Sequence, residues 1–200
     1  MRAALNRAPK DAELGSAGDV AAQRAGLLLL ERSADSLLQM HQSANYDVFV
    51  GQNFFLPSVL YAAWAYQLRS DSAAARAAFD SALVRLHTAA DELPDDWRVH
   101  AALGLALAGL GHRNEALREA SWLQQSTTCR EDALHGPSVA EDRVRILAQA
   151  GDAEVAFGEI ERLLAGPSWL SVHTLRLDPR WDPIREHPRF KALLAKYAER

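Results

Sequence analysis

The histidines, the serines and a single cysteine are the residues of this 200-residue chain that could bind a metal or act in catalysis. Metal ligands on one helix stand three or four residues apart, and no two of the seven histidines have that spacing. No HExxH sequence occurs either. His100 and His112 are interpreted as a packing residue and a turn residue. The sequence therefore predicts no metal site and no cofactor.

The motifs of common enzymes are also incomplete. Gly136-Pro137-Ser138 lacks the glycine that follows a nucleophilic serine by two positions, and serine near a helix start is ordinarily a cap. Gly104, Gly109 and Gly111 lack the lysine and hydroxyl residue of a phosphate loop. His112-Arg113-Asn114 only superficially resembles a kinase catalytic loop, and no Asp-Phe-Gly is present. We expect no catalytic residues and no enzymatic activity.

Composition limits the partners and the compartment. Cys129 is the only cysteine, which excludes an internal disulfide and favours a reducing, cytoplasmic location. Arg130 beside it could lower the pKa of the thiol, although an ordinary exposed thiol is the simpler interpretation. A net charge of −4 and a pI near 6.0 give no general reason to expect nucleic acid or a membrane as partner. Leu27–Leu30 is too short for a signal peptide or a membrane span.

A repeat becomes visible when Ser70, Gly111 and Gly151 are aligned as turns between two helices. The turns are 41 and 40 residues apart, against about 34 in the standard tetratricopeptide repeat. Around each turn, small residues recur where two helices would meet, and larger apolar residues recur between them: Ala63, Ala75, Gly104, Ala116 and Ala156, with Tyr66, Phe79, Leu107 and Ile160. The pattern predicts an all-α solenoid of antiparallel helix-turn-helix pairs with a C-terminal capping helix.

The extra length of each pair comes from insertions. The second helix of the first pair is expected over about 72–92, after which Pro94 ends it and Asp96 caps the next helix. The polar stretch 126–132 is expected to lengthen a loop. Ahead of the pairs, we expect one long amphipathic helix over 19–41 and an ordered loop over 45–55. The predicted organisation is an N-terminal helical segment (1–56), three helix pairs (57–167) and a cap (168–200).

The last part of the chain combines proline-preceded helix starts with large apolar side chains. Asp178-Pro179 and Asp182-Pro183 each place an N-cap carboxylate before a proline. Nine apolar residues are expected to fold back onto Val155, Ile160, Leu163 and Leu164: Trp169, Leu170, Leu175, Leu177, Trp181, Ile184, Phe190, Leu193 and Leu194. Residues 176–200 carry seven basic and four acidic side chains, which leaves nucleic-acid binding through arginines 176, 180, 185 and 189 as an alternative to a solvated face.

Several segments carry a resemblance to a known family: Leu93-Pro94-Asp95-Asp96, Leu103-Gly104, 132–137, 163–169 and the proline-rich tail. Over roughly residues 54–198 the chain resembles the tetratricopeptide region that follows protein kinase, adenylate cyclase, TolB-like or winged-helix domains in bacterial regulators. The resemblance implies a regulatory or scaffolding helical array in a signalling system. It does not imply catalysis, because these residues contain no such effector domain, and the chain is either a fragment or a free-standing member.

In helical repeats the first helix of each pair lines a concave surface whose outward positions vary with the ligand. By the alignment these positions are Leu60, Trp64, Gln67, Arg98, Ala101, Leu105, Ala108, Glu141, Arg145, Ala148 and Gln149. An aromatic residue at one end and two arginines further along suit an extended or helical peptide with acidic groups. The function expected is thus protein–protein interaction or scaffolding.

Two other interpretations of the same residues stay open. Trp64 could instead pack under the N-terminal helix, and the arginines could pair with Glu141 or Asp142. A different class of function is a regulatory domain that senses a small molecule in a pocket near Trp64, which mostly apolar walls would favour.

Overall fold

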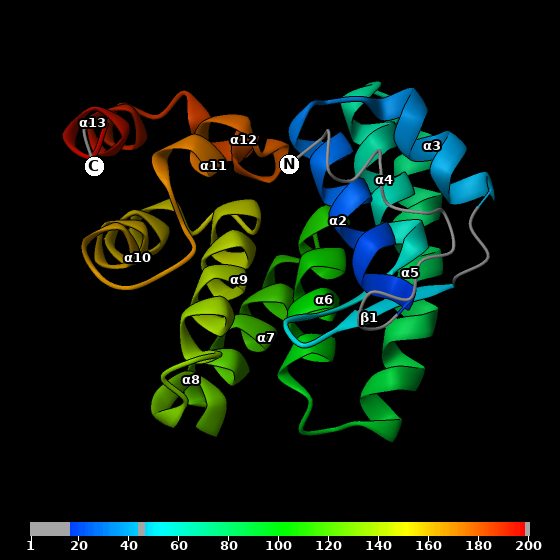
Figure 1. Cartoon of the computed structure of the whole chain (residues 1–200), viewed down its shortest axis with the longest axis horizontal. Coiled ribbons are helices and arrows are strands. Elements are labelled where there is room, and N and C mark those ends of the chain that lie inside the picture. Colours follow the sequence, from blue (N-terminus) through cyan, green and yellow to red (C-terminus); the bar gives the residue numbers. More distant parts are fainter. Residues whose placement is uncertain (1–16, 44–46, 199–200) are drawn as a thin grey trace. The chain divides into compact units, whose positions relative to one another are not determined.

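The computed structural model describes residues 17–43 and 47–198 of the chain. These residues are mostly helical, as predicted, and include a small two-stranded sheet (Figure 1). They form two compact units that divide between Arg85 and Leu86, within helix α5 (Ser72–Glu92). The predicted limits at 56 and 167 stay predictions.

The first unit contains two helices, a hairpin and a further helix ahead of α5. Their bounds are α2 (Ala17–Leu30), α3 (Ala34–Ser43), β1 (Val48–Gly51), β2 (Phe54–Pro57) and α4 (Ser58–Leu68). Helix α3 packs along α4, and α2 packs against both α3 and β1. Large side chains from several of these elements are fully buried: Leu29, Leu37, Phe49, Leu60 and Phe79.

The prediction of one long helix over 19–41 is wrong. Helix α2 ends at Leu30 and α3 begins at Ala34, because Arg32 takes a left-handed conformation with φ of 55°. The Arg32 amide donates to the Leu29 carbonyl, and the Ser33 amide donates to the Leu28 carbonyl. This pair of bonds is a Schellman motif, which ends a helix and turns the chain back.

The predicted loop at 45–55 is also wrong for the residues that the structure describes, 47–55. Strands β1 and β2 pair antiparallel, with Phe49 opposite Leu56 and Gly51 opposite Phe54. Only Gln52 and Asn53 connect the strands. Phe49 lies 2% exposed and meets the Tyr61 ring edge-on at 5.8 Å, so the hairpin contributes an anchor to the core of the first unit.

The second unit begins with the end of α5 and continues through a helical array and a cap. The array comprises α6 (Trp97–Gly109), α7 (Arg113–Gln125), α8 (Thr127–Glu131), α9 (Gly136–Gln149) and α10 (Ala153–Ala165). The cap comprises α11 (Val172–Leu177), η1 (Pro179–Trp181), α12 (Asp182–Arg185) and α13 (Pro188–Lys196). Helix α9 packs against both α6 and α7, and α10 packs against α9 (Figure 1).

The three predicted turns have one backbone geometry. Ser70, Gly111 and Gly151 have φ of 58°, 78° and 81°. After each of them the next amide donates to the carbonyl five residues earlier, from Asp71 to Tyr66 and likewise at the other two turns. These are Schellman motifs like the one at Arg32, so the α2–α3 turn is a fourth example.

Most predicted helix boundaries in this region are confirmed. Helix α5 runs from Ser72 to Glu92, and the Asp96 carboxylate caps α6 by accepting from the Arg98 amide at 2.9 Å. The stretch 126–132 is not simply a loop, because Ser126 caps the short helix α8. Asp182 is not an N-cap either: it is the first residue of α12, and its carboxylate accepts from Arg185 instead.

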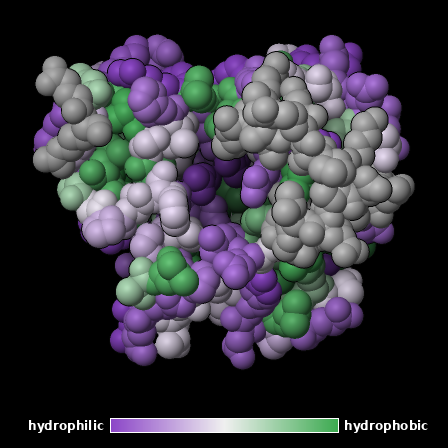
Figure 2. Space-filling view, viewed as in Figure 1, coloured by the Kyte–Doolittle hydropathy of each residue, from purple (hydrophilic) through white to green (hydrophobic). Residues whose placement is uncertain are grey.

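The cap buries most of the apolar residues expected to be buried, including Leu175, Trp181 and Phe190, each 0% exposed. Helices η1 and α12 pack on α9, and α13 packs on α10; apolar residues gather where α10 and α13 meet (Figure 2). Trp169 and Leu177 depart from the prediction, with 71% and 52% of their surface exposed. The tail therefore covers α9 as well as the predicted α10.

Gly104 provides a test of the packing between α6, α7 and α9. A Cβ atom at this position would lie 2.5 Å from Ile146 Cδ1 and 3.1 Å from Glu119 Cβ. Replacing Gly104 by leucine should therefore lower the free energy of unfolding by about 1–3 kcal/mol through overpacking. Urea denaturation measures the change.

The matched control is Gly158, another helical glycine, where an added Cβ would meet nothing within 4 Å. Gly158→Ala should leave the unfolding midpoint unchanged or raise it, since alanine is the better helix former by about 1 kcal/mol. An unchanged midpoint in Gly104→Leu would contradict the helix register described above.

Candidate functional site

Helix α9 presents a row of polar side chains on one face. Glu141, Arg145 and Gln149 are four residues apart and therefore stand one turn above the other. Pro137 lies in the first turn of α9, where a missing amide hydrogen is harmless, so the row is carried on a regular helix. The α9 polar row, as we call these three residues, contains three of the four predicted ligand-binding positions on α9, the fourth being Ala148.

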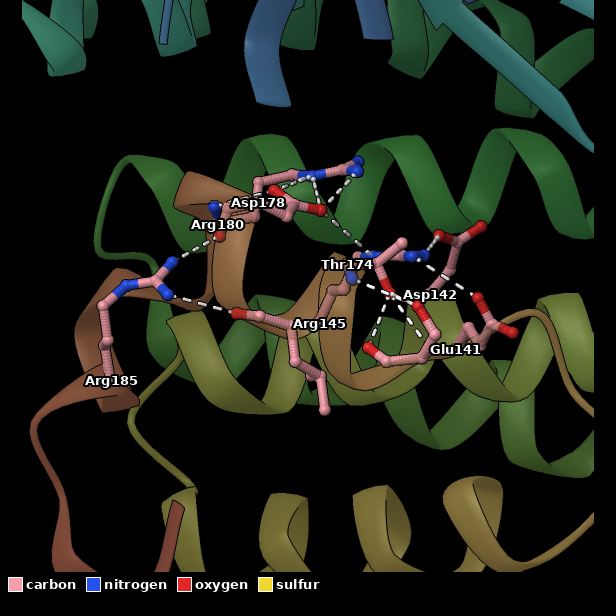
Figure 3. Close-up of polar contacts among 9 residues, drawn as sticks. Glu141, Asp142, Arg145, Thr174, Asp178, Arg180 and Arg185 are labelled. Carbon is pink, nitrogen blue, oxygen red and sulfur yellow. Dashed lines mark hydrogen bonds and ion pairs between the residues drawn. The ribbon is translucent and has the colours of Figure 1, made fainter. Parts of the chain in front are cut away.

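Arg145 is the centre of a charged cluster within the second unit (Figure 3). Its guanidinium donates to Asp142 Oδ1 at 2.7 Å and reaches Glu141 Oε2 at 3.4 Å. Asp178 Oδ2 lies 3.9 Å from Arg145 Nε, and the Trp181 ring lies 5.8 Å from the guanidinium carbon. The side chain thus links α9 to the cap through two kinds of contact, an ion pair and a cation–π interaction.

Asp178 is the most buried charge of the cluster, with 2% of its surface exposed. Its carboxylate accepts the Arg180 amide at 2.9 Å, and it accepts from Arg180 Nε and Nη2 at 3.0 and 2.7 Å. Burial by itself would raise the pKa of Asp178, but the guanidinium groups of Arg180 and Arg145 outweigh it and hold the pKa below the ordinary value. Asp178 is therefore a charged N-cap that also fixes Arg180.

Arg185 holds the other side of the cap through backbone groups. Its guanidinium donates to the carbonyl oxygens of Leu175, Arg176 and Asp178 at 3.2, 2.6 and 2.8 Å. The last carbonyls of a helix have no partner within it, so Arg185 supplies partners at the end of α11 (Figure 3).

Glu141 is a buried acid at the lower-numbered end of the α9 polar row. It is 5% exposed, and its Oε1 atom has no hydrogen-bond partner. Burial raises the pKa of Glu141 above its ordinary value, although Arg145 and the backbone amides of Trp169 and Leu170 beside the carboxyl group oppose the rise.

Three donor atoms of Arg145, Gln149 and Trp181 also make no hydrogen bond. Arg145 Nε, Gln149 Nε2 and Trp181 Nε1 are buried atoms without a hydrogen bond in this structure. Leaving a buried polar group unsatisfied costs about 1–3 kcal/mol, so such groups cluster where a ligand or water can meet them. Arg145 and Gln149 as residues keep partial exposure. A polar ligand can therefore reach the side chains of Arg145 and Gln149, whereas Trp181, at 0% exposed, and Glu141, at 5%, are covered.

The structure places the predicted contact residues in different environments. Leu60, Trp64 and Gln67 belong to α4 in the first unit, and the other eight positions belong to the second. Seven of the eleven positions are buried, whereas Gln67 is exposed; the buried ones are Leu60, Trp64, Ala101, Leu105, Ala108, Glu141 and Ala148. Trp64 meets the Tyr61 ring edge-on at 5.4 Å.

The two predicted arginines, Arg98 and Arg145, have different ion-pair partners. Arg145 pairs with Glu141 and Asp142, as the second interpretation of the sequence had it. Arg98 instead pairs with Asp96, two residues away, at 2.6 Å. The sequence did not predict that Asp178, Arg180 and Trp181 would join the site, since nothing local connects them to α9.

Other residues with chemical potential were also considered. His41 Nδ1 lies 3.2 Å from Ser58 Oγ beside a cavity of about 10 Å³ in the first unit. That volume corresponds to about one water molecule, so a substrate cannot reach Ser58 there. Burial raises the pKa of Cys129, contrary to the effect that Arg130 could have had, and makes the thiol less reactive.

No family model, curated protein or solved structure matches this chain. Among residues 17–43 and 47–198, no helix combines the length and the apolar composition that crossing a membrane requires. The same residues contain no group of three or more histidine, cysteine or acidic side chains arranged to hold a metal ion.

Asp178 gives the most direct test of the charged cluster. Replacing it by alanine should lower the free energy of unfolding by about 3–5 kcal/mol, because Arg180 and Arg145 lose a buried partner. Folding lowers the pKa of Asp178, so its carboxylate stabilises the folded chain fully above its ordinary pKa of 3.8. This stabilisation is lost as the pH falls through the lower pKa that Asp178 has in the folded chain. Urea denaturation at several pH values between 3 and 7 measures both effects.

Asp182→Ala is the matched control, because Asp182 is 41% exposed and pairs with Arg185 at the surface. It should change stability by less than about 1 kcal/mol. Equal effects of Asp178→Ala and Asp182→Ala would show that the buried cluster does not hold the cap.

Proposed function

We propose that this chain is a non-enzymatic protein-interaction module, a tetratricopeptide-type array that binds a peptide segment of a partner in a bacterial signalling system. The proposal is supported by the shared turn geometry at Ser70, Gly111 and Gly151. It is also supported by the packing of α9 on both helices of the preceding pair, which is how successive pairs stack in a solenoid.

The N-terminal helices extend the proposed array to a fourth pair. Helices α2 and α3 are joined by the same Schellman turn at Arg32, and α3 packs along α4 as α7 packs along α9. The hairpin β1–β2 stands between this pair and the next as an insertion.

The observation that carries the binding proposal is the α9 polar row with its unsatisfied atoms. Successive members of the row are about 6 Å apart along the helix axis. Alternate residues of an extended peptide are about 6.6 Å apart, so a peptide running along α9 would bring one backbone or side-chain group to each member of the row. Since two of the three unsatisfied atoms of the row are donors, Arg145 Nε and Gln149 Nε2, peptide carbonyls or acidic side chains suit the row best.

Gln149 is the member of the row whose substitution disturbs the fold least. Arg145 is unsuitable as a test residue, because its loss would also release the cap. The side-chain amide nitrogen of Gln149 donates no hydrogen bond, so replacing Gln149 by leucine removes no hydrogen bond from that atom.

We therefore expect Gln149→Leu to weaken peptide binding by about tenfold or more while thermal stability stays unchanged. The probe is a set of peptides enriched from a random displayed library on the full chain, with affinities measured by fluorescence anisotropy. Gln125→Leu, the same change on α7, should leave the affinity as it is. Equal affinities of both variants and the unchanged chain would place the binding site elsewhere, and a library without enrichment would argue against peptide binding altogether.

A further inference from the structure

His100 on α6 lies between two acceptors that come from different parts of the second unit. Its Nδ1 atom is 2.7 Å from Glu119 Oε2 on α7. Its Nε2 atom is 2.9 Å from the carbonyl oxygen of Pro94, in the turn that follows α5. The imidazole ring also stacks on Trp122 of α7, with centroids 3.7 Å apart and an angle of 18° between the planes.

These contacts require two ring protons. A backbone carbonyl cannot donate, and an ionised carboxylate cannot donate either. Neutral histidine has one N–H group, so it would leave one of its ring nitrogens with a lone pair facing another lone pair. The doubly protonated ring satisfies both contacts and places its positive charge against the face of an indole.

The charged groups around His100 favour this state. Glu119 faces it from α7, and Asp96 acts on it from the turn before α6. Helix α9, the third element packed here, directs Arg143 away toward Glu159 and Gln124. Burial lowers the pKa of His100, but the bonds to Glu119 and to the Pro94 carbonyl outweigh it, and the net pKa is raised above the ordinary 6.5.

We propose that His100 is a proton-dependent clamp that ties the start of α6 to α7 and to the turn after α5. With the second proton bound, three segments are joined through one side chain. When this proton is lost, one of the two contacts becomes repulsive and the turn at 93–96 is released. The clamp thus couples the order of the α5–α6 connection to pH.

The direction of the effect follows from linkage. A group whose pKa rises on folding stabilises the folded state fully below its unfolded pKa, here 6.5, and the contribution disappears as the pH rises through the folded pKa. The unfolding equilibrium constant should therefore increase on going from pH 6.5 upward, by at most about tenfold per pH unit.

The first measurement is a ¹⁵N NMR titration of the histidine rings in the full chain, with the His100 signals assigned from their absence in His100→Gln. We expect both His100 nitrogens to carry protons at pH 6.5 in most molecules, with a titration midpoint above that value. A midpoint at or below 6.5 would overturn the proposal, whatever the variants do.

The second measurement is urea denaturation of variants between pH 5.5 and 8.5. Glu119→Gln keeps the size of the side chain and gives it an amide that can donate to neutral Nδ1, so the rise in the unfolding constant with pH should shrink relative to the unchanged chain. His112→Gln is the control, because His112 pairs with Glu115 at the surface, and it should keep the original slope. The proposal fails if Glu119→Gln keeps that slope too.

Discussion

Ile146 of α9 occupies the space that a side chain at position 104 of α6 would need. This close approach fixes α9 against α6 and α7, and the rest of the second unit is built on α9. Val139, Val144 and Ile146 of α9 are each 0% exposed, so the helix is held by apolar contacts on more than one side. Arg145 of the polar row then reaches Asp178 and Trp181 of the cap, while Glu141 is buried and Gln149 stays partly exposed. The position of the polar row thus depends on the close approach that the missing side chain at Gly104 allows.

The charged cluster at the cap contributes more to positioning than to net stability. Removing two charges from water costs about as much as their attraction returns, so a buried ion pair adds little to the free energy of folding. Breaking it is costly, however, because one charge is then left without a partner. The ion pairs of Asp178 with Arg180 and Arg145 therefore favour one position of the cap on α9. In this position the Trp181 ring lies beside the guanidinium of Arg145.

Sequence patterns were sufficient where the signal was local. The turns at Gly111 and Gly151 were predictable because glycine adopts positive φ without strain, and α5 was predictable because Pro94 stops it. The turn at Arg32 carried no such signal, since arginine is rare in a left-handed conformation. The hairpin did carry a local signal that we interpreted as a loop: the segments Val48–Val50 and Phe54–Leu56 stand on either side of Gln52-Asn53.

The candidate site was predictable only in part. The predicted register of α9 was sufficient to group Glu141, Arg145 and Gln149, because helical spacing places residues four apart on one face. The partners Asp178 and Trp181 follow Arg145 by more than thirty residues and reach α9 only through tertiary packing. Burial of Leu60, Trp64 and Leu105 likewise depends on what packs over them, which spacing along one helix does not specify.

The way in which Arg185 holds the end of α11 has a consequence for how this region can diverge. Its guanidinium binds main-chain oxygens, and every residue type presents the same carbonyl group. An exposed neighbour such as Arg176 can therefore change identity without weakening the link, while Arg185 itself cannot be replaced by a side chain with fewer donors. Related chains could thus keep this cap with little sequence in common apart from that arginine.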